Sequence, residues 1–275
     1  MINIDDLINS ATKLEPLPEA VAKLILVLGK DDVSMKEIDD IFSCDGPLTA
    51  RLLRQANSAS SGSHKQIGTI SAAMIRLGIG GILALAISAS TQKQLSSSLP
   101  QYKIDSGGLW RHAQAARMAV DAMRKYSKID IIPEAQTAAL LHDIGKIVMA
   151  EYLEPEVLAI LQCATEESSI IGMEAEKEVL EVHHGELGGL IAQHWDLPEC
   201  IVRGIQYHHD PEACTDAHID ICHIVCTANW IAKAVESKIR KQQYTEDTPF
   251  SAEYLGISED DLEKIIDAVT EKLDI

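Results

Sequence analysis

Aromatic and basic residues are both scarce in this 275-residue sequence. Phe, Trp and Tyr make up 4% of it, and 24 Lys and Arg face 42 Asp and Glu, for a formal net charge of −18. So acidic a surface repels phosphate backbones, and we therefore expect no binding to nucleic acid. The longest apolar run, near residues 77–89, is interrupted by glycines and is shorter than the ~20 residues of a membrane span. No membrane segment is expected.

Strand patterns and cysteine frameworks are also missing. No segment shows the alternation of apolar and polar residues that marks a half-buried strand. The six cysteines lack the spacing of a disulfide framework, so we expect reduced thiols in a cytoplasmic protein. What remains is 46% hydrophobic residues, mostly aliphatic and recurring at helical spacing. This composition predicts an all-α protein.

Start and stop signals divide the chain into helices and three larger parts. Ser34 and Asp45 each precede an apolar helical pattern and are expected to cap it, as is Thr69 or Ser71 further on. The glycines of residues 78–81 are expected to interrupt the helix that follows. We predict an N-terminal helical subdomain over residues 1–105, a helical subdomain carrying the candidate site over 106–240, and a linker with an amphipathic helix over 241–275.

The segment from Ala139 to Ile147 places three chemical groups in an apolar helical run. In the continuous helix predicted from Pro133 onward, His142 and Lys146 share one face and Asp143 projects about 100° round the axis. Burying such groups is costly unless a metal ion, a phosphate or an internal salt bridge satisfies them. A glycine within this helix, Gly145, indicates the close approach of another backbone or of a ligand.

Histidines are concentrated in the second half of the chain, on or beside apolar helices. They are His112, His142, His183, His184, His194, His208 and His209. A helix bundle can direct such side chains to one interior point, and imidazole with carboxylate favours iron, manganese or zinc. The alternative is an ordinary hydrogen-bonded helix residue, which we favour for His194 and His64. A second pattern, His218, Cys222 and Cys226, is either a metal site or core packing, and core packing is the commoner case.

Several stretches together resemble the HDOD family, whose members are relatives of the HD-superfamily metal-dependent phosphohydrolases. The matching pieces are Asp45-Gly46-Pro47-Leu48, Leu109-Trp110-Arg111-His112, Leu141-His142-Asp143-Ile144-Gly145-Lys146, His184-Gly185-Glu186-Leu187-Gly188, Trp195-Asp196-Leu197-Pro198 and Ile205 to His209. The resemblance covers roughly residues 14–235. It implies an HD-like multi-helix bundle with an additional N-terminal helical subdomain, in a bacterial signalling protein.

The resemblance also implies a set of site residues. His112, His142 and Asp143 would hold one metal ion, and His184, His208 and His209 a second, with Asp143 shared between them. Asp143 and Lys146 would be the catalytic residues, Lys146 contacting a substrate phosphate. The weaker candidates are His183 and Asn229.

This sequence departs from the enzymes of the superfamily at two places. Asn229 stands where those enzymes have an aspartate, and an amide is a neutral, weaker ligand. After His208-His209 comes Asp210-Pro211-Glu212 instead of Gly-Tyr-Pro, so specific cyclic-di-GMP hydrolysis is not expected.

Two functions follow from this set. The first is a regulatory protein that recruits a protein signalling partner and retains a metal site. The alternative is a metal-dependent phosphohydrolase acting on a phosphoester or nucleotide. A metal- or oxygen-sensing module is a third, weaker interpretation.

Overall fold

The computed structural model describes residues 4–11, 13–30, 32–57, 66–152, 173, 176–177 and 180–273. Within these ranges every regular element is a helix, and the β pairing is confined to one isolated bridge between Leu99 and Ile104. The predicted all-α class is therefore confirmed. The elements are α1 (Ile4–Ala11), α2 (Glu19–Leu28), α3 (Met35–Ser43), α4 (Gly46–Ala56), α5 (Ile70–Leu95), η2 (Pro100–Tyr102), α6 (Gly108–Met123), α7 (Ala135–Leu141), α8 (Gly145–Tyr152), α11 (His184–His194), α12 (Glu199–Gln206), η3 (Pro211–Ala213), α13 (Ile219–Ile239), α14 (Phe250–Tyr254) and α15 (Glu259–Leu273).

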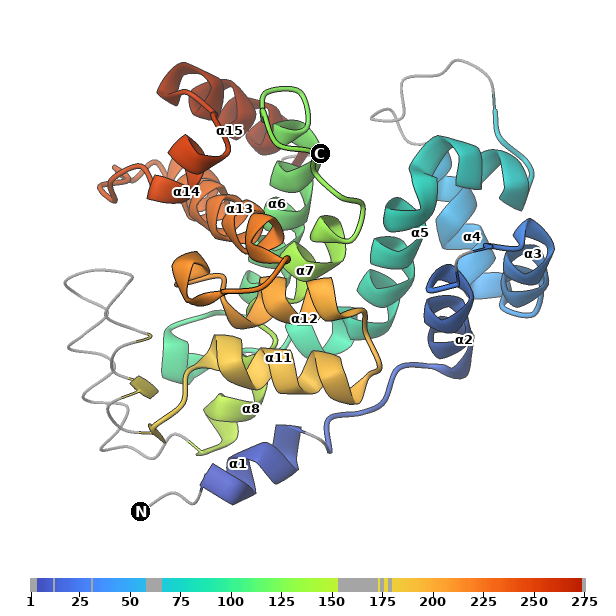
Figure 1. The fold of residues 1–275 in the computed structure, drawn as a ribbon, viewed down its shortest axis with the longest axis horizontal. Coiled ribbons are helices and arrows are strands. Elements are labelled where there is room, and N and C mark those ends of the chain that lie inside the picture. Colours follow the sequence, from blue (N-terminus) through green and yellow to red (C-terminus); the bar gives the residue numbers. More distant parts are fainter. Residues whose placement is uncertain are drawn as a thin grey trace.

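Helices α2 to α5 form one group, on the right of Figure 1, in which α2, α3 and α4 pack against α5. Helix α5 also packs against α7 and so joins this group to the rest of the molecule. It bends at Gly78, whose φ of 69° and ψ of 170° are non-helical, which confirms the interruption expected there. By length and composition, α5 is the one helix in the described ranges that would suit a membrane span.

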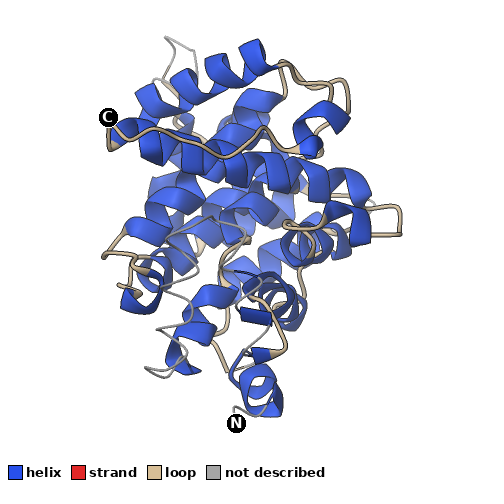
Figure 2. Ribbon diagram, turned by 90° about the vertical axis from the view of Figure 1, so that its left-hand side faces the viewer, coloured by secondary structure: helices blue, strands red, loops and turns tan. Residues whose placement is uncertain are grey.

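The second group contains the histidine-rich helices. The long helix α13 packs along α6 and also contacts α7, α12 and α15, while α11 lies between α12 and α8. Figure 2, turned by 90°, shows that the helices of the molecule pack on one another in layers. The N-terminal helix α1 also belongs to this second group, because it packs against α8 and α11, which lie far from it in the sequence. This stacking buries an aliphatic core that is continuous with the histidine-bearing faces of α6 and α11 and with α12, which precedes His208 and His209.

Local sequence signals start the helices where they were expected. The Ser34 side chain accepts a hydrogen bond from the Glu37 backbone N–H, and Asp45 Oδ1 accepts one from Leu48 at 2.9 Å. Thr69 rather than Ser71 caps α5. These caps satisfy backbone donors that the first helical turn leaves free.

Two predicted helices are interrupted in the structure. The helix expected to run through His142 and Asp143 is wrong as a continuous element, because α7 ends at Leu141, a turn carries residues 142–144 and α8 begins at Gly145. The sequence also predicts a helix from Glu174 to Ile191. Within the described part of that range it is broken, since Glu181 has a φ of 60° and α11 begins at His184. Both breaks fall at site residues, where the need to turn a side chain overrides helical periodicity.

Candidate metal centre

Six side chains from four separate parts of the chain converge in the second group of helices. They form two sets of donor atoms, His112 with His142 and Asp143, and His184 with His208 and His209, and the donor atoms within each set lie within 4.8 Å of one another. All but His209 are buried. Helix α6 supplies His112, the turn after α7 supplies His142 and Asp143, α11 supplies His184, and the turn after α12 supplies His208 and His209.

In the first set the two imidazoles face one another through their Nε2 atoms. His112 Nε2 and His142 Nε2 are 3.2 Å apart, and Asp143 Oδ2 lies 3.8 Å from the former and 3.6 Å from the latter. Two nitrogens bound to one zinc ion at about 2.0–2.1 Å lie roughly 3.3 Å apart in tetrahedral geometry. The spacing of this pair therefore suits shared ligation of one ion.

The second set faces the other oxygen of the same carboxylate. Asp143 Oδ1 is 3.1 Å from His184 Nε2 and 4.0 Å from His208 Nε2. His209 Nε2 is in turn 2.9 Å from His184 Nε2. Asp143 thus stands between the two sets and presents one oxygen to each.

Four of the five histidines are held by a hydrogen bond from the outer ring nitrogen. The Nδ1–H of His142 donates to the Ala139 carbonyl and that of His208 to the Ile205 carbonyl, both at 2.7 Å. His184 Nδ1 donates to Glu176 and His112 Nδ1 to Glu236, at 2.7 and 3.2 Å. These bonds place the proton on Nδ1 and leave the Nε2 lone pair directed inward, as metal-ligating histidines require.

Burial keeps most of these imidazoles neutral. It lowers the pKa of His142 to about 4 and lowers the pKa of His208 and His209 well below the ordinary value. His184 differs: burial opposes protonation, yet the Glu176 carboxylate raises its pKa. Neutral imidazole is the form that binds metal, so the set is suited to ligation at neutral pH.

Asp143 is a charged carboxylate despite its burial. Burial would raise the pKa of this carboxyl, but the Lys146 ammonium and His142 hold it well below its usual range. Lys146 Nζ donates to Asp143 Oδ2 at 2.7 Å from the first turn of α8. The two residues are three positions apart at the start of α8, a spacing that brings side chains together.

Sequence reasoning missed two acidic residues and a tyrosine that support the site. Glu176 accepts hydrogen bonds from His184 through Oε2 and from the Tyr102 hydroxyl through Oε1, the latter at 2.8 Å. Glu236 supports His112 from α13. Glu236 stands seven residues after Asn229 on one helix face, a spacing that could have indicated it. Nothing in the sequence links Tyr102 or Glu176 to the histidines, because their contacts are tertiary.

The weaker candidates have distinct places. Asn229 Oδ1 lies 3.1 Å from His112 Nε2, beside the first set. His183 caps α11, accepting a hydrogen bond from the Gly185 N–H, with its ring 6.0 Å from that of His184. His194 is exposed at the end of α11, and His64 lies outside the described residues.

The alternative cysteine pattern behaves as core packing. The Cys222 thiol donates to the Arg203 and His218 carbonyls at 3.3 and 3.4 Å, and burial raises its pKa. A thiol held in this way is not the thiolate that a metal requires.

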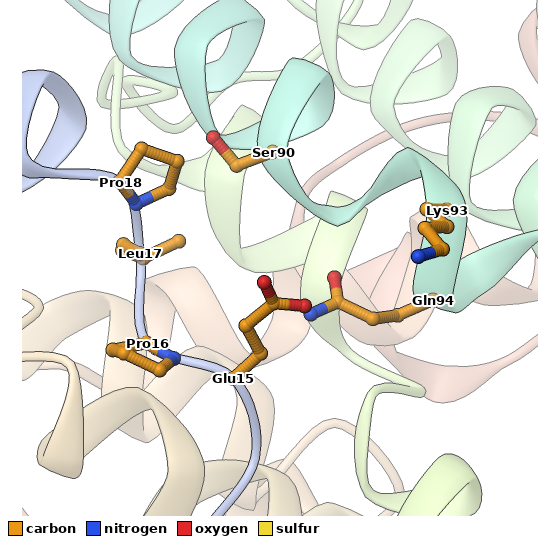
Figure 3. A pocket seen from close by; sticks show the side chains of 7 residues that line it. All are labelled: Glu15, Pro16, Leu17, Pro18, Ser90, Lys93 and Gln94. Carbon is orange, nitrogen blue, oxygen red and sulfur yellow. The ribbon is translucent and has the colours of Figure 1, made fainter.

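A small cavity lies apart from the histidines. It has a volume of about 150 Å³ and is enclosed by residues 15–18 and by Ser90, Lys93 and Gln94 of α5. In Figure 3 the side chains of Glu15 and Gln94 point toward each other across it. Its lining contains none of the six converging donors.

Two polar atoms at the centre test whether a metal ion fits. Asp143 Oδ1 and His208 Nε2 are fully buried and, in the part of the chain that the structure describes, neither makes a well-oriented hydrogen bond; the nearest imidazole nitrogen to Asp143 Oδ1 is His184 Nε2, at 3.1 Å. Such atoms are costly unless a further partner satisfies them. A divalent cation would satisfy both, so the residues present fit a metal.

The fold and this arrangement define an all-α protein with a histidine–aspartate cluster of the HD type. The chain belongs to the HDOD domain family, whose model matches residues 14–211. The resemblance drawn from the motifs is thereby confirmed.

Solved structures and one curated protein are similar to this chain. A crystal structure named as a candidate phosphohydrolase, from Shewanella amazonensis SB2B, is 25% identical with a TM-score of 0.68, covering 96% of this chain and 93% of that one. An HDOD domain protein of unknown function from Geobacter sulfurreducens is 20% identical with a TM-score of 0.69, covering 99% and 98%. An uncharacterized protein of Treponema pallidum (strain Nichols) is 26% identical over 237 residues, 85% of this chain. The chain spans 45% of the length of that relative.

Proposed function

We propose that this chain is a regulatory HDOD protein whose histidine–aspartate cluster binds one or two divalent metal ions. The observation that carries the proposal is the pair of buried atoms at the centre that make no well-oriented hydrogen bond, Asp143 Oδ1 and His208 Nε2. Further support comes from His142 and His208, whose Nδ1–H groups donate to backbone carbonyls and so leave Nε2 free to bind a metal. His112, His142 and Asp143 would hold one ion, and His184, His208 and His209 the other.

The donor set narrows the metal to iron, manganese or zinc. Five imidazoles with one carboxylate exclude the all-oxygen environment that calcium and magnesium prefer. Asn229 adds a neutral oxygen beside the first set, where a carboxylate would add charge.

Elemental analysis of protein purified without a metal-affinity step tests the proposal. We expect one or two equivalents of metal in the natural chain, and loss of at least one in His142→Ala. The matched control is His194→Ala, which removes an exposed imidazole of α11. A chain that stays metal-free after incubation with all three ions contradicts the proposal.

The regulatory role concerns a protein signalling partner in the cytoplasm. It predicts that Asp143→Ala, which removes the carboxylate shared by both sets, leaves recruitment of that partner intact as long as the fold persists. Loss of recruitment in a folded Asp143→Ala chain would assign the metal centre a direct part in signalling.

Phosphoester hydrolysis is the second candidate, favoured by the ammonium of Lys146 beside Asp143. Bound divalent ions supply Lewis-acid activation of water and of a phosphoryl oxygen. This chain's part would be to hold Asp143 ionised, to keep His142, His208 and His209 neutral, and to offer Lys146 to a phosphate as a point charge.

A turnover assay separates the two candidates. Manganese-loaded protein is given p-nitrophenyl phosphate, with Asp143→Asn as the site variant and His194→Ala as the control. Hydrolysis that requires Asp143 supports the enzyme. Hydrolysis that survives in Asp143→Asn comes from a contaminant, and metal-loaded protein without turnover leaves the regulatory role.

A further inference from the structure

A second lysine lies at the edge of the cluster, on the face of α13 that supplies Asn229 and Glu236. Lys233 stands four residues after Asn229 and three before Glu236, so the three side chains project from one helix face. Asn229 and Glu236 both contact His112. Lys233 therefore lies on the face of α13 that borders the site.

The ammonium of Lys233 is only loosely paired. Its partner is Glu246, whose Oε2 lies 3.6 Å from Lys233 Nζ, too long for a hydrogen bond. Both side chains are about one quarter exposed, at 26% and 27%. A partly buried ammonium with such a partner keeps its donors available to an anion.

Glu246 is held in this place by the segment that follows α13. The Tyr244 hydroxyl donates to Glu246 Oε2 at 2.7 Å, and Trp230 Nε1 of α13 donates to the Asp247 carbonyl at 2.9 Å. The Tyr244 and Trp230 rings meet edge to face with centroids 5.3 Å apart. The segment therefore returns along α13 and sets one carboxylate against Lys233.

Lys233 and Lys146 act on the same groups from different helices. Burial lowers the pKa of Lys233, and the Lys146 ammonium adds to that effect while Glu246 and Asp143 oppose it. Both ammonium groups also contribute to the lowered pKa of His209, after burial and the neighbouring imidazoles. The contacts agree with this: Lys146 binds Asp143 Oδ2, which lies 3.8 Å from His112 Nε2, and Lys233 follows Asn229, whose Oδ1 lies 3.1 Å from the same nitrogen.

We propose that Lys233 and Lys146 together form the anion-binding edge of the metal centre and receive the dianionic phosphate of a phosphomonoester. The inference rests on the proposed metal site. All the histidines of the two sets except His209 are buried, whereas the side chains of Lys146 and Lys233 are 19% and 26% exposed and so are open to a ligand from solvent. Two ammonium groups match the two charges of a terminal phosphate, and Glu246 occupies Lys233 until that phosphate displaces it.

The proposal is tested by measuring how inorganic phosphate binds to the manganese-loaded full chain. Binding is detected as line broadening of the 31P signal, and the metal content is measured on every sample. We expect Lys233→Gln to weaken phosphate binding by about tenfold, the effect of one lost charge-assisted hydrogen bond. Glu246→Gln should strengthen binding by about threefold because it removes the competing carboxylate. Lys238→Gln is the control, since Lys238 lies on the same helix but pairs with Asp267 at the surface.

The outcomes separate this inference from the proposed function. Natural chain without metal overturns both. If the metal-loaded chain binds no phosphate, the inference is overturned and the proposed metal centre is not affected. The same holds if Lys233→Gln and Lys238→Gln bind phosphate equally well. A comparison of p-nitrophenyl phosphate with its bis-ester as competitors tests the ligand class, and equal competition by the singly charged diester contradicts the monoester assignment.

Discussion

Gly145 lies directly against the backbone of His184, so that α8 and α11 meet at a point where no side chain fits. A Cβ built on Gly145 would stand 2.0 Å from the His184 carbonyl oxygen and 2.9 Å from the Gly188 nitrogen. The close backbone approach indicated by a glycine inside the apolar run is confirmed. It holds Asp143 and His184 on facing elements.

Gly145→Ala should therefore displace α11 and separate the two donor sets. We expect a loss of roughly 1–3 kcal/mol in the free energy of unfolding, as overpacking of close-packed elements costs, together with reduced metal content. Thermal unfolding and elemental analysis measure the two effects. Gly46→Ala is the control, because nothing lies within 4 Å of a Cβ at that position of α4. Equal stability of the two variants would show that α8 and α11 can part without cost.

Tyr102→Phe should weaken the metal centre from a distance. It removes the hydroxyl that donates to Glu176, which in turn holds His184, and one such hydrogen bond is worth about 1 kcal/mol, or roughly fivefold in affinity. Competition against a chelator measures the change. Tyr254→Phe is a matched control, since its hydroxyl donates to Asp220 at 2.7 Å on an exposed surface. Identical metal affinity in both variants would mean that Glu176 is held without Tyr102.

Asn229→Asp should change stability in opposite directions with and without metal. A carboxylate beside His112 adds a charged ligand, and we expect metal affinity to rise by about tenfold. Without metal, the same charge stands near Asp143 and Glu236 and should lower the unfolding temperature. Thermal scans with manganese and with a chelator test this crossover. A shift of the same sign in both conditions would contradict a ligand role for position 229.

Metal-free protein should lose stability as the pH falls. The folded chain holds His142 with a pKa of about 4, below the 6.5 of an unfolded histidine, because burial excludes the charged form. The unfolded state therefore binds more protons between pH 6.5 and about 4, and stability present above this window is lost within it. His208 and His209 act in the same direction, whereas the raised pKa of His184 opposes them.

Urea unfolding between pH 7.5 and 5 in the presence of a chelator measures this slope. His142→Gln should flatten it, while His194→Gln should leave it unchanged because that side chain is exposed. A natural chain whose stability is constant over this range would show that the imidazoles titrate equally in both states.

The sequence predicts what local chemistry decides. The caps at Ser34 and Asp45 and the bend at Gly78 depend on residues within one turn, and all appear in the structure. The break after Leu141 was not predicted, because the apolar spacing of the segment continues across it and only the tertiary contacts of Asp143 explain it.

The site divides in the same way. The six predicted donors lie in motifs that can be identified in the sequence, and the structure brings all six together. Tyr102 and Glu176 are 74 residues apart and meet only through folding. Lys233 has a helical relation to Asn229, but that relation acquires meaning only once Asn229 is seen beside His112.

The contact between His112 of α6 and Glu236 of α13 also bears on where the boundary of the functional unit lies. The family match ends at residue 211, yet Asn229, Lys233 and Glu236 come from a helix that begins at Ile219. A segment cut at the family boundary would keep all six donors and lose the carboxylate that orients His112. The stretch of chain that holds the first donor set in place is therefore longer than the stretch that the family model matches.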